Sequence, residues 1–419
     1  MKTQNKIFYG WWVVLAVFFI WFSWAVTPFA VILKQLMTEF NTGRGEVSII
    51  PAVWAISSGF SAFFTSRLIH NHSPRKFMLT GLPLMGLAFL LCSLAQSLWH
   101  LYILYFFMGT FNGITGAIVC VALLSKWFVR KRGLAVGVAL SGMYIGSIAI
   151  IPLVSLVAVQ FGWRATYLLA GFLVLAVGIP LITRVIKDTP QQMGLLPDGE
   201  KHTRETSTIP EAGTNIKDSF PRQTGITTFL KRLPLWLIVI SFPLAAMGNV
   251  AIIQHEFAFV TDIGIPSAIA ASAFGITTGL GGIGGFLSGW MADRISPRYV
   301  AIIFLAVSII GVLLLMRVSG VTSLWLFVIV FGLASGVQGI LLPLVIGDIF
   351  GSANLAVIFG FANILFTFGF AAGVPLAGYI FDANGSYALV FIIVILLYIT
   401  SMVTMYFAYG VRPLPWRRN

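Results

Sequence analysis

Charged residues are scarce in this chain: Asp, Glu, Lys and Arg make up 9% of its 419 residues, whereas hydrophobic residues make up 58%. The mean hydropathy is +0.95. A water-soluble domain has no means of keeping so much apolar surface dry, whereas a helix of about 20 apolar residues spans the ~30 Å hydrocarbon core of a bilayer. The composition therefore excludes an ordinary soluble protein and predicts one embedded in a membrane.

Cysteine is scarce too, and clusters of reactive side chains are absent from the sequence. Cys92 and Cys120 lie in apolar segments, without a CxxC pair or the spacing of zinc ligands. We find no nucleophile–base pair, and the glycine-rich run at 281–285 follows no strand, as a phosphate-binding loop would. We therefore expect no metal, no cofactor and no enzymatic activity.

Apolar stretches of helical length recur along the whole chain. They lie near residues 8–33, 45–69, 77–97, 99–124, 133–158, 163–186, 234–260, 268–292, 299–319, 322–347, 354–380 and 386–410. They predict an all-α membrane protein with twelve transmembrane helices, in a six-helix bundle at 1–186 and another at 227–419. The polar segment 187–226 between them is expected to be a flexible cytoplasmic linker.

The basic residues are distributed unevenly about these helices. With both termini in the cytoplasm, 22 of the 26 Lys and Arg residues fall on cytoplasmic segments, and only Lys34, Arg44, Arg164 and Arg317 fall outside. This excess predicts the orientation, because cytoplasmic loops are enriched in positive charge. It also explains the net charge of +13 through topology and attraction to anionic lipid, so we expect no nucleic-acid partner.

The two halves of the chain form an internal repeat at an offset of 223 residues. The aligned residues of the first half are Gly59, Ser73, Pro74, Arg75, Gly109, Gly113, Gly116, Gly137, Pro152 and Gly162, each matched by the same residue type in the second half. Chance is a poor explanation for such matches in Gly, Pro, Ser and Arg. We therefore expect two pseudo-symmetric bundles, with a small molecule bound between them and access alternating by rocking. Because one chain holds both halves of such a cavity, we expect a monomer.

Five stretches carry a resemblance to a known family. They are YGWW (9–12), FSWA (22–25), EFNTGRGEVS (39–48), WFVRKRGLA (127–135) and PQQMGLLPDG (190–199). With them the chain resembles the major facilitator superfamily, and within it the monocarboxylate and oxalate/formate transporter branch, in its bacterial form. The resemblance implies a multi-pass protein of the bacterial cytoplasmic (inner) membrane that transports a small organic solute.

The resemblance also identifies a cytoplasmic gate motif, a carboxylate and arginines in the loop after the second helix of each half. In the second half the motif is intact, with Gly289, Asp293, Arg294 and Arg298. In the first half the corresponding residues are Ser66, His70, Asn71 and Arg75. His70 in place of Asp is either a neutral replacement in a loop or a pH-sensitive element of the gate, since His titrates near neutral pH.

The chain departs from the branch where relatives bind the substrate carboxylate. The arginine of the eighth helix corresponds to Gly285, and an aspartate one turn earlier corresponds to Gly281. A lysine of the first helix corresponds to the region of Thr27 and Pro28. A buried carboxylate needs charged partners, so these replacements oppose carboxylate transport by the mechanism of the branch.

Polar residues near the middle of helices are the remaining candidates for substrate contact. They are Trp24, Asn112, Thr115, Tyr144, Asn249, His255, Ser335, Gln338, Asn363 and Thr367. The repeat relates three of them in the first half to three in the second, at matching depths where two bundles can share one ligand. For each residue, a hydrogen bond between helices is an equally good explanation.

Ionisable residues at membrane depth are few, and such residues are costly and usually functional. His255 and Glu256 are the candidates for coupling to protons, although Glu256 is explained equally well by a position at the membrane interface. Lys34 is expected to extend its amine to water at the outer end of its helix.

The sequence thus favours a secondary active transporter of a small organic solute, a carboxylate-type anion, driven by protons or by exchange. The alternative is a polyspecific exporter of hydrophobic or neutral compounds on the same fold. The absence of a Gly-Pro pair after Gly146 favours uptake over export. A third possibility, a transporter-like sensor, would use residues 187–226 or 411–419 as an output surface, and neither segment has a feature that suggests one.

The His70 hypothesis makes a direct prediction. If His70 tunes the gate, replacing it with aspartate (His70→Asp) restores a carboxylate that stays ionised at neutral pH, so the pH dependence of transport should shift. Initial rates of transport in proteoliposomes between pH 5 and 8 measure this. A profile that matches the wild type would leave the neutral replacement as the explanation.

Overall fold

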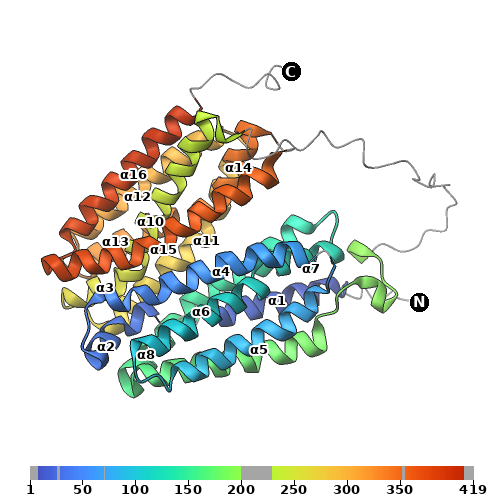
Figure 1. Cartoon of the computed structure of the whole chain (residues 1–419), viewed down its shortest axis with the longest axis horizontal. Coiled ribbons are helices and arrows are strands. Elements are labelled where there is room, and N and C mark those ends of the chain that lie inside the picture. The colour runs from blue at the N-terminus through green and yellow to red at the C-terminus, as the bar shows by residue number, and fades with distance from the viewer. Residues whose placement is uncertain (1–7, 26–28, 70, 200–228, 352–353, 410–419) are drawn as a thin grey trace.

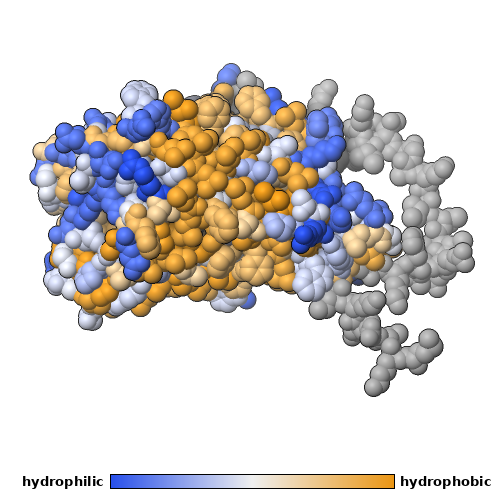
Figure 2. Space-filling model, turned by 90° about the horizontal axis from the view of Figure 1, so that it is seen from below, coloured by the Kyte–Doolittle hydropathy of each residue, from blue (hydrophilic) through white to orange (hydrophobic). Residues whose placement is uncertain are grey.

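The computed structural model describes residues 8–25, 29–69, 71–199, 229–351 and 354–409, and within these ranges all regular structure is helical (Figure 1). By length and composition, eleven helical runs among them are able to cross a membrane. Figure 2 shows a hydrophobic band across the face in view, between two hydrophilic ends. The fold is therefore an all-α membrane fold, as predicted.

The described helices form two groups, the N-half before residue 200 and the C-half after residue 228. The N-half contains α1 (Gly10–Trp24), α2 (Phe29–Phe40), α3 (Arg44–Val47), α4 (Ile49–Leu68), α5 (Pro74–Cys92), α6 (Leu98–Thr115), α7 (Ala117–Trp127), α8 (Arg132–Pro180) and the short turns η1 (Leu181–Val185), η2 (Pro190–Met193) and η3 (Pro197–Gly199). The C-half contains α10 (Leu233–Asp262), α11 (Ser267–Ala292), α12 (Pro297–Met316), α13 (Val321–Ser335), α14 (Gln338–Phe350), α15 (Leu355–Asn384) and α16 (Ala388–Ala408).

The sequence repeat is also a repeat of structure. Pro74 begins α5 and Pro297 begins α12, 223 residues later, and the same offset separates the first residues of α6 and α13 and of α8 and α15. The packing repeats as well: α1 packs on α8 as α10 packs on α15, α4 on α6 as α11 on α13, and α5 on α8 as α12 on α16. Equivalent helices therefore occupy equivalent places in the two halves.

The long helix α8 reverses direction at Gly162. This glycine has φ 81° and ψ 172°, outside the helical region, and its repeat partner Gly385 (φ 66°) separates α15 from α16. Both ends of the run lie together, because the ring of Phe8 contacts Phe128 near its start while the neighbouring Tyr9 hydroxyl donates to the carbonyl of Val185 near its end. The 54-residue run from Arg132 to Val185 therefore consists of two antiparallel segments.

The molecule has two ends, which we name for what lies there. The linker end contains residues 129–132, 187–199 and 293–298, and the first and last described residues also lie there. The Arg44 end contains residues 39–46, 262–266 and 379–387.

Residues 187–199 differ from the prediction of a flexible linker, because they are folded against the N-half. The Asp188 carboxylate accepts hydrogen bonds from the Ser73 hydroxyl (2.6 Å) and the N–H of Arg75 (3.0 Å) at the start of α5. The Asp198 carboxylate accepts from the N–H groups of Val129 and Arg130, before α8. Burial acts to raise the pKa of Asp198, but these N–H groups outweigh it and hold that pKa below its ordinary value.

Glycines set how closely helices pack within each half, and α8 offers a matched pair. A Cβ added at Gly142 would overlap the carbonyl oxygen of Phe18 on α1, whereas one added at Gly137 meets nothing within 4 Å. We expect Gly142→Ala to destabilise the fold by about 1–3 kcal/mol through overpacking. Gly137→Ala should be neutral or stabilising by about 0.5–1 kcal/mol, since alanine favours the helix. Thermal unfolding in detergent measures both, and equal effects would contradict the packing shown here.

Candidate functional site

The two halves cross at two equivalent points. On α8, Tyr144 packs over Gly282 of α11, where an added Cβ would lie 2.7 Å from the Tyr144 Cγ. On α15, Thr367 packs over Gly59 of α4, where the added Cβ would lie 2.8 Å from the Thr367 Cγ2. Tyr144 and Thr367 are repeat partners, as are Gly59 and Gly282. The contact between the halves therefore follows the same pseudo-symmetry as the halves themselves.

Toward the linker end, the halves separate from these crossing points. Gly137 and Gly360 lie two helical turns from Tyr144 and Thr367 on the same helix faces, and a Cβ added at either glycine meets nothing within 4 Å. Toward the Arg44 end the helices stay in contact, since a Cβ added at Gly275 would lie 2.7 Å from the carbonyl oxygen of Ser147. The structure is thus closed at the Arg44 end, and the ribbons diverge toward the linker end (Figure 1).

Arg44 joins the two halves at the closed end. It lies on α3 of the N-half and is only 5% exposed. Its Nη2 lies 2.7 Å from Oδ2 of Asp262, its Nη1 donates to the Tyr387 hydroxyl (2.8 Å), and its guanidinium lies 3.7 Å from the centre of the Phe381 ring. All three partners belong to the C-half. In addition, the Asp382 carboxylate accepts the backbone N–H of Arg44 (2.9 Å).

Lys34 of α2 contacts the same carboxylate. Its Nζ lies 2.6 Å from Oδ1 of Asp262 and donates to the Thr261 hydroxyl at 2.7 Å. The Lys34 side chain is 36% exposed, so its amine reaches the surface as expected, but it also contacts a carboxylate of the other half. One carboxylate of the C-half is therefore held between two cations of the N-half.

His255 extends this network into the interior of the C-half. Its Nε2 lies 3.0 Å from the carbonyl oxygen of Val374, which can only accept, so Nε2 carries the proton. Its Nδ1 lies 2.8 Å from the Tyr387 hydroxyl and, in the neutral imidazole, accepts from it. Because that hydroxyl accepts from Arg44, a chain of hydrogen bonds runs from Arg44 through Tyr387 to His255, which is 3% exposed.

Glu256 is buried on another side of α10. It is 1% exposed, its Oε1 accepts from the Thr277 hydroxyl of α11 (2.8 Å), and its Oε2 has no hydrogen-bond partner. Of the two explanations offered for this residue, a place at the membrane interface is therefore wrong. Glu256 faces the interior of the C-half rather than the crossing points.

Most of the other predicted residues are bonded within one half. The side-chain oxygen of Asn112 accepts a hydrogen bond from the Ser58 hydroxyl at 2.8 Å, and buried Thr115 packs against Gly81. In the C-half, the amide of Asn249 donates to the backbone carbonyl of Ser335 at 2.7 Å. That carbonyl lies at the end of α13, where the helix breaks before α14 and leaves it free to accept. These residues hold helices together, the alternative explanation given above.

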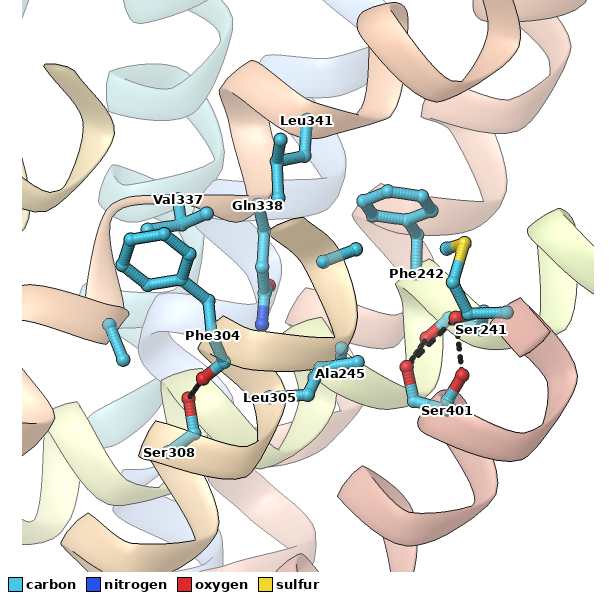
Figure 3. A pocket seen from close by; sticks show the side chains of 13 residues that line it. Ser241, Phe242, Ala245, Phe304, Leu305, Ser308, Val337, Gln338, Leu341 and Ser401 are labelled. Atoms are coloured by element: carbon cyan, nitrogen blue, oxygen red, sulfur yellow. Dashed lines mark hydrogen bonds between the residues drawn. The ribbon is translucent and has the colours of Figure 1, made fainter. Parts of the chain in front are cut away.

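Gln338, Trp24 and Asn363 also lie apart from one another. Gln338 points from α14 into a small pocket inside the C-half, among hydroxyls that include those of Ser241 and Ser308 (Figure 3). The pocket holds about 20 Å³, room for one water molecule. Trp24 is 8% exposed and packs on Trp21, whereas Asn363 is exposed on α15. Of the three symmetric pairs expected to share a ligand, the structure brings only Tyr144 and Thr367 to the crossing points.

The predicted gate residues make contacts within their own halves. Arg75 donates to the carbonyls of Ile182 and Thr183. Arg294 lies over the ring of Trp290, and Arg298 lies over that of Tyr406. Asp293 is the C-cap of α11. His70, Thr27 and Pro28 lie outside the described residues. None of these contacts joins the two halves, which agrees with the separation of the halves at the linker end.

Sequence reasoning missed the group formed by Arg44, Asp262, Asp382 and Tyr387. A signal was present, because Arg44 and Lys34 are two of the four basic residues that do not follow the cytoplasmic pattern. A basic residue outside the cytoplasmic segments needs a nearby acidic residue, and a search for that acidic residue would have led to the group.

Comparisons with known proteins agree with this architecture. A family model described as Major Facilitator Superfamily matches residues 13–295 and 257–419. Monocarboxylate transporter 13 of Bos taurus is 26% identical over 92% of this chain and 86% of its own length, and human monocarboxylate transporter 12 is 25% identical over 96% and 80%. Membrane sensor protein UhpC of Salmonella typhimurium is 27% identical, over 66% of this chain and 63% of its own.

Among solved structures, a bacterial homologue of the human lysosomal transporter Spinster, in an inward-facing and unoccupied conformation, superposes with a TM-score of 0.67. It is 13% identical and covers 97% of this chain and 96% of its own. The resemblance inferred from the five stretches is thus confirmed. These proteins are membrane transporters and a membrane sensor, not enzymes.

The hydrogen-bond chain through Tyr387 yields a matched pair of variants. Tyr387→Phe removes a hydroxyl bonded to a charged donor, which costs about 1.5–3 kcal/mol and should weaken closure of the Arg44 end. The control, Tyr398→Phe on the same helix, removes a buried hydroxyl that has no partner. Ala52→Cys reports opening, since Ala52 is 8% exposed and lies in one hydrophobic cluster with Ala371 of the C-half, and the native cysteines are buried. Maleimide labelling of this cysteine in detergent should rise about tenfold or more in Tyr387→Phe alone; equal rates in the two variants would contradict the role given to Tyr387.

Proposed function

Because the chain belongs to the major facilitator superfamily, we propose that it is a secondary active transporter that moves a small carboxylate-type anion by alternating access. The observation that carries this proposal is the asymmetry of the interface between the halves. They are joined at one end by the ion pairs that buried Arg44 and half-exposed Lys34 make with Asp262, and they are apart at the other end, as expected for one state of a rocking transporter.

The proposed topology has twelve crossings in two bundles, residues 1–186 and 227–419, joined by the linker 187–226. Dividing α8 at Gly162 gives the twelfth crossing, since each part is long enough to span a bilayer. The linker end, with both termini, lies in the cytoplasm of a bacterial cell, which makes the described state inward-facing. Arg75, Asp293, Arg294 and Arg298, with His70, then hold the linker end shut in the opposite state.

A carboxylate substrate is supported by the cations at the closed end and by the names of the monocarboxylate transporter relatives. Gly285, which replaces the arginine of the branch, has no side chain with which to pair an anion, so the charge for a carboxylate must come from elsewhere. The alternative, export of hydrophobic or neutral compounds, is favoured by a different observation. Of the predicted polar set, only Tyr144 and Thr367 lie at the crossing points.

For proton coupling, the contacts support His255 over Glu256. Protonation at Nδ1 would turn an acceptor into a donor, so the Tyr387 hydroxyl could no longer donate to it. The charged groups around His255 are Arg44 from α3 and Asp382 from α15, with Tyr387 between, while Glu256 faces α11. A proton on His255 would therefore disturb the hydrogen bond between Tyr387 and Arg44, which helps to keep the Arg44 end closed. Among the described residues, Glu256 bonds only to Thr277 of its own half, so a proton on Glu256 would not affect a contact with the N-half.

The first experiment is uptake of labelled mono- and dicarboxylates into proteoliposomes, with and without an inward proton gradient. We expect at least one acid to be taken up and the gradient to stimulate it. His255→Gln should reduce that stimulation by at least about fivefold, whereas Glu256→Gln, its matched neighbour, should retain it.

Other outcomes lead to different conclusions. Transport of hydrophobic or neutral compounds without any acid would support the exporter. Failure of a folded protein to transport either class would favour a sensor. Stimulation that survives in His255→Gln but not in Glu256→Gln would assign the proton to Glu256.

A further inference from the structure

The repeat shows why the partners of Asp262 come from the other half. Its counterpart in the N-half is Glu39, which pairs with Arg164 of the same half at 2.8 Å. The residue that corresponds to Arg164 in the C-half is Tyr387, which is neutral. Asp262 therefore lacks the cation that its repeat partner has, and Arg44 and Lys34 of the N-half supply two instead.

The arrangement around Asp262 is that of a carboxylate bound in a site. Lys34 contacts Oδ1 and Arg44 contacts Oδ2, so each oxygen has its own cation. Such charge-assisted contacts to both oxygens are the geometry with which proteins recognise carboxylates. The Arg44 guanidinium is further positioned by the Phe381 ring and the Tyr387 hydroxyl.

Opening of the Arg44 end would divide this arrangement unequally. Asp262, Asp382 and Tyr387 would leave with the C-half, and the two cations would stay on the N-half. Lys34 and Arg44 would then lie close together without their counterion. An anion that bound between them would offset this loss, and it could do so only after Asp262 has left.

We propose that Lys34 and Arg44 form a binding site for a carboxylate that is available only when the Arg44 end is open, in the place that Asp262 occupies in the closed state. The site rests on the proposed function, because it requires alternating access, and it gives the anion a role in that cycle. A ligand that binds one of two states shifts the equilibrium toward that state. Substrate carboxylate and Asp262 therefore compete, and arrival of the substrate favours opening.

The test measures opening directly. Spin labels at Thr38→Cys and Ser386→Cys, both exposed and on opposite halves at the Arg44 end, report the distance between the halves. The native cysteines are buried and need no replacement. In nanodiscs at fixed pH and ionic strength, sodium acetate or sodium oxalate replaces sodium chloride. We expect the carboxylates to raise the ratio of open to closed molecules at least about fivefold over chloride.

Variants then separate a binding site from a simple lock. Lys34→Gln and Arg44→Gln should abolish the response to acetate and oxalate, and Arg44→Lys should restore part of it. Arg164→Gln is the matched control, because it breaks an ion pair that lies within one half, and it should retain the response in full. Asp262→Asn keeps both cations and removes the competitor, so half-maximal opening should require at least about fivefold less carboxylate.

Three results would overturn the proposal. They are a wild-type response equal to that in chloride, a response that survives in Lys34→Gln and Arg44→Gln, and an Asp262→Asn protein that is open to the same extent with and without carboxylate. These outcomes are distinct from failure of the transport function. Acid uptake with an unchanged KM in Lys34→Gln and Arg44→Gln would support the transport function and contradict the binding site. Carboxylate-dependent opening without uptake would support the binding site and contradict the transport function.

Discussion

The structure depends on the burial of one guanidinium. Arginine does not lose its charge in proteins, and a buried charge must be paired, so Arg44 can be 5% exposed only while Asp262 and Tyr387 surround it. Both partners belong to the other half. The requirement to pair this charge therefore holds two bundles together at a point where neither could satisfy it alone.

Rocking about the crossing points turns this local requirement into a property of the whole molecule. Tyr144 over Gly282 and Thr367 over Gly59 are equivalent contacts, so they favour neither end of the molecule. The ends are not equivalent: Glu39 finds Arg164 in its own half, whereas Asp262 finds its cations across the interface. Arginine at one position of the repeat and Tyr387 at its equivalent leave Asp262 to pair with cations of the other half, which makes the closed Arg44 end a joint between the halves.

The sequence predicted the all-helical membrane fold, the repeat and the family, because each rests on composition or on spacing along the chain. It did not predict which polar side chains face the other half. In membrane helices the lipid-facing and packed faces are both apolar, so hydrophobic periodicity gives little indication of rotation about the helix axis. Thr115 and Asn112 thus looked like cavity residues and are bonded inside the N-half. The partners of Arg44 lie more than 200 residues away, and only the packing of α2 on α10 and of α3 on α15 brings them together.

The proposals for the anion and for the proton meet at the same guanidinium. In the closed state, Lys34 and Arg44 balance Asp262 and Asp382, and Nδ1 of a neutral His255 would accept from Tyr387. A monocarboxylate between the two cations would add one negative charge at this end, and a proton on His255 would add one positive charge to the same network. Arrival of both leaves the net charge of the network unchanged while each disturbs a different contact of Arg44. Coupling of one anion to one proton would then follow because both act on Arg44. It would not require an arginine that binds the substrate carboxylate on the helix that carries Gly285.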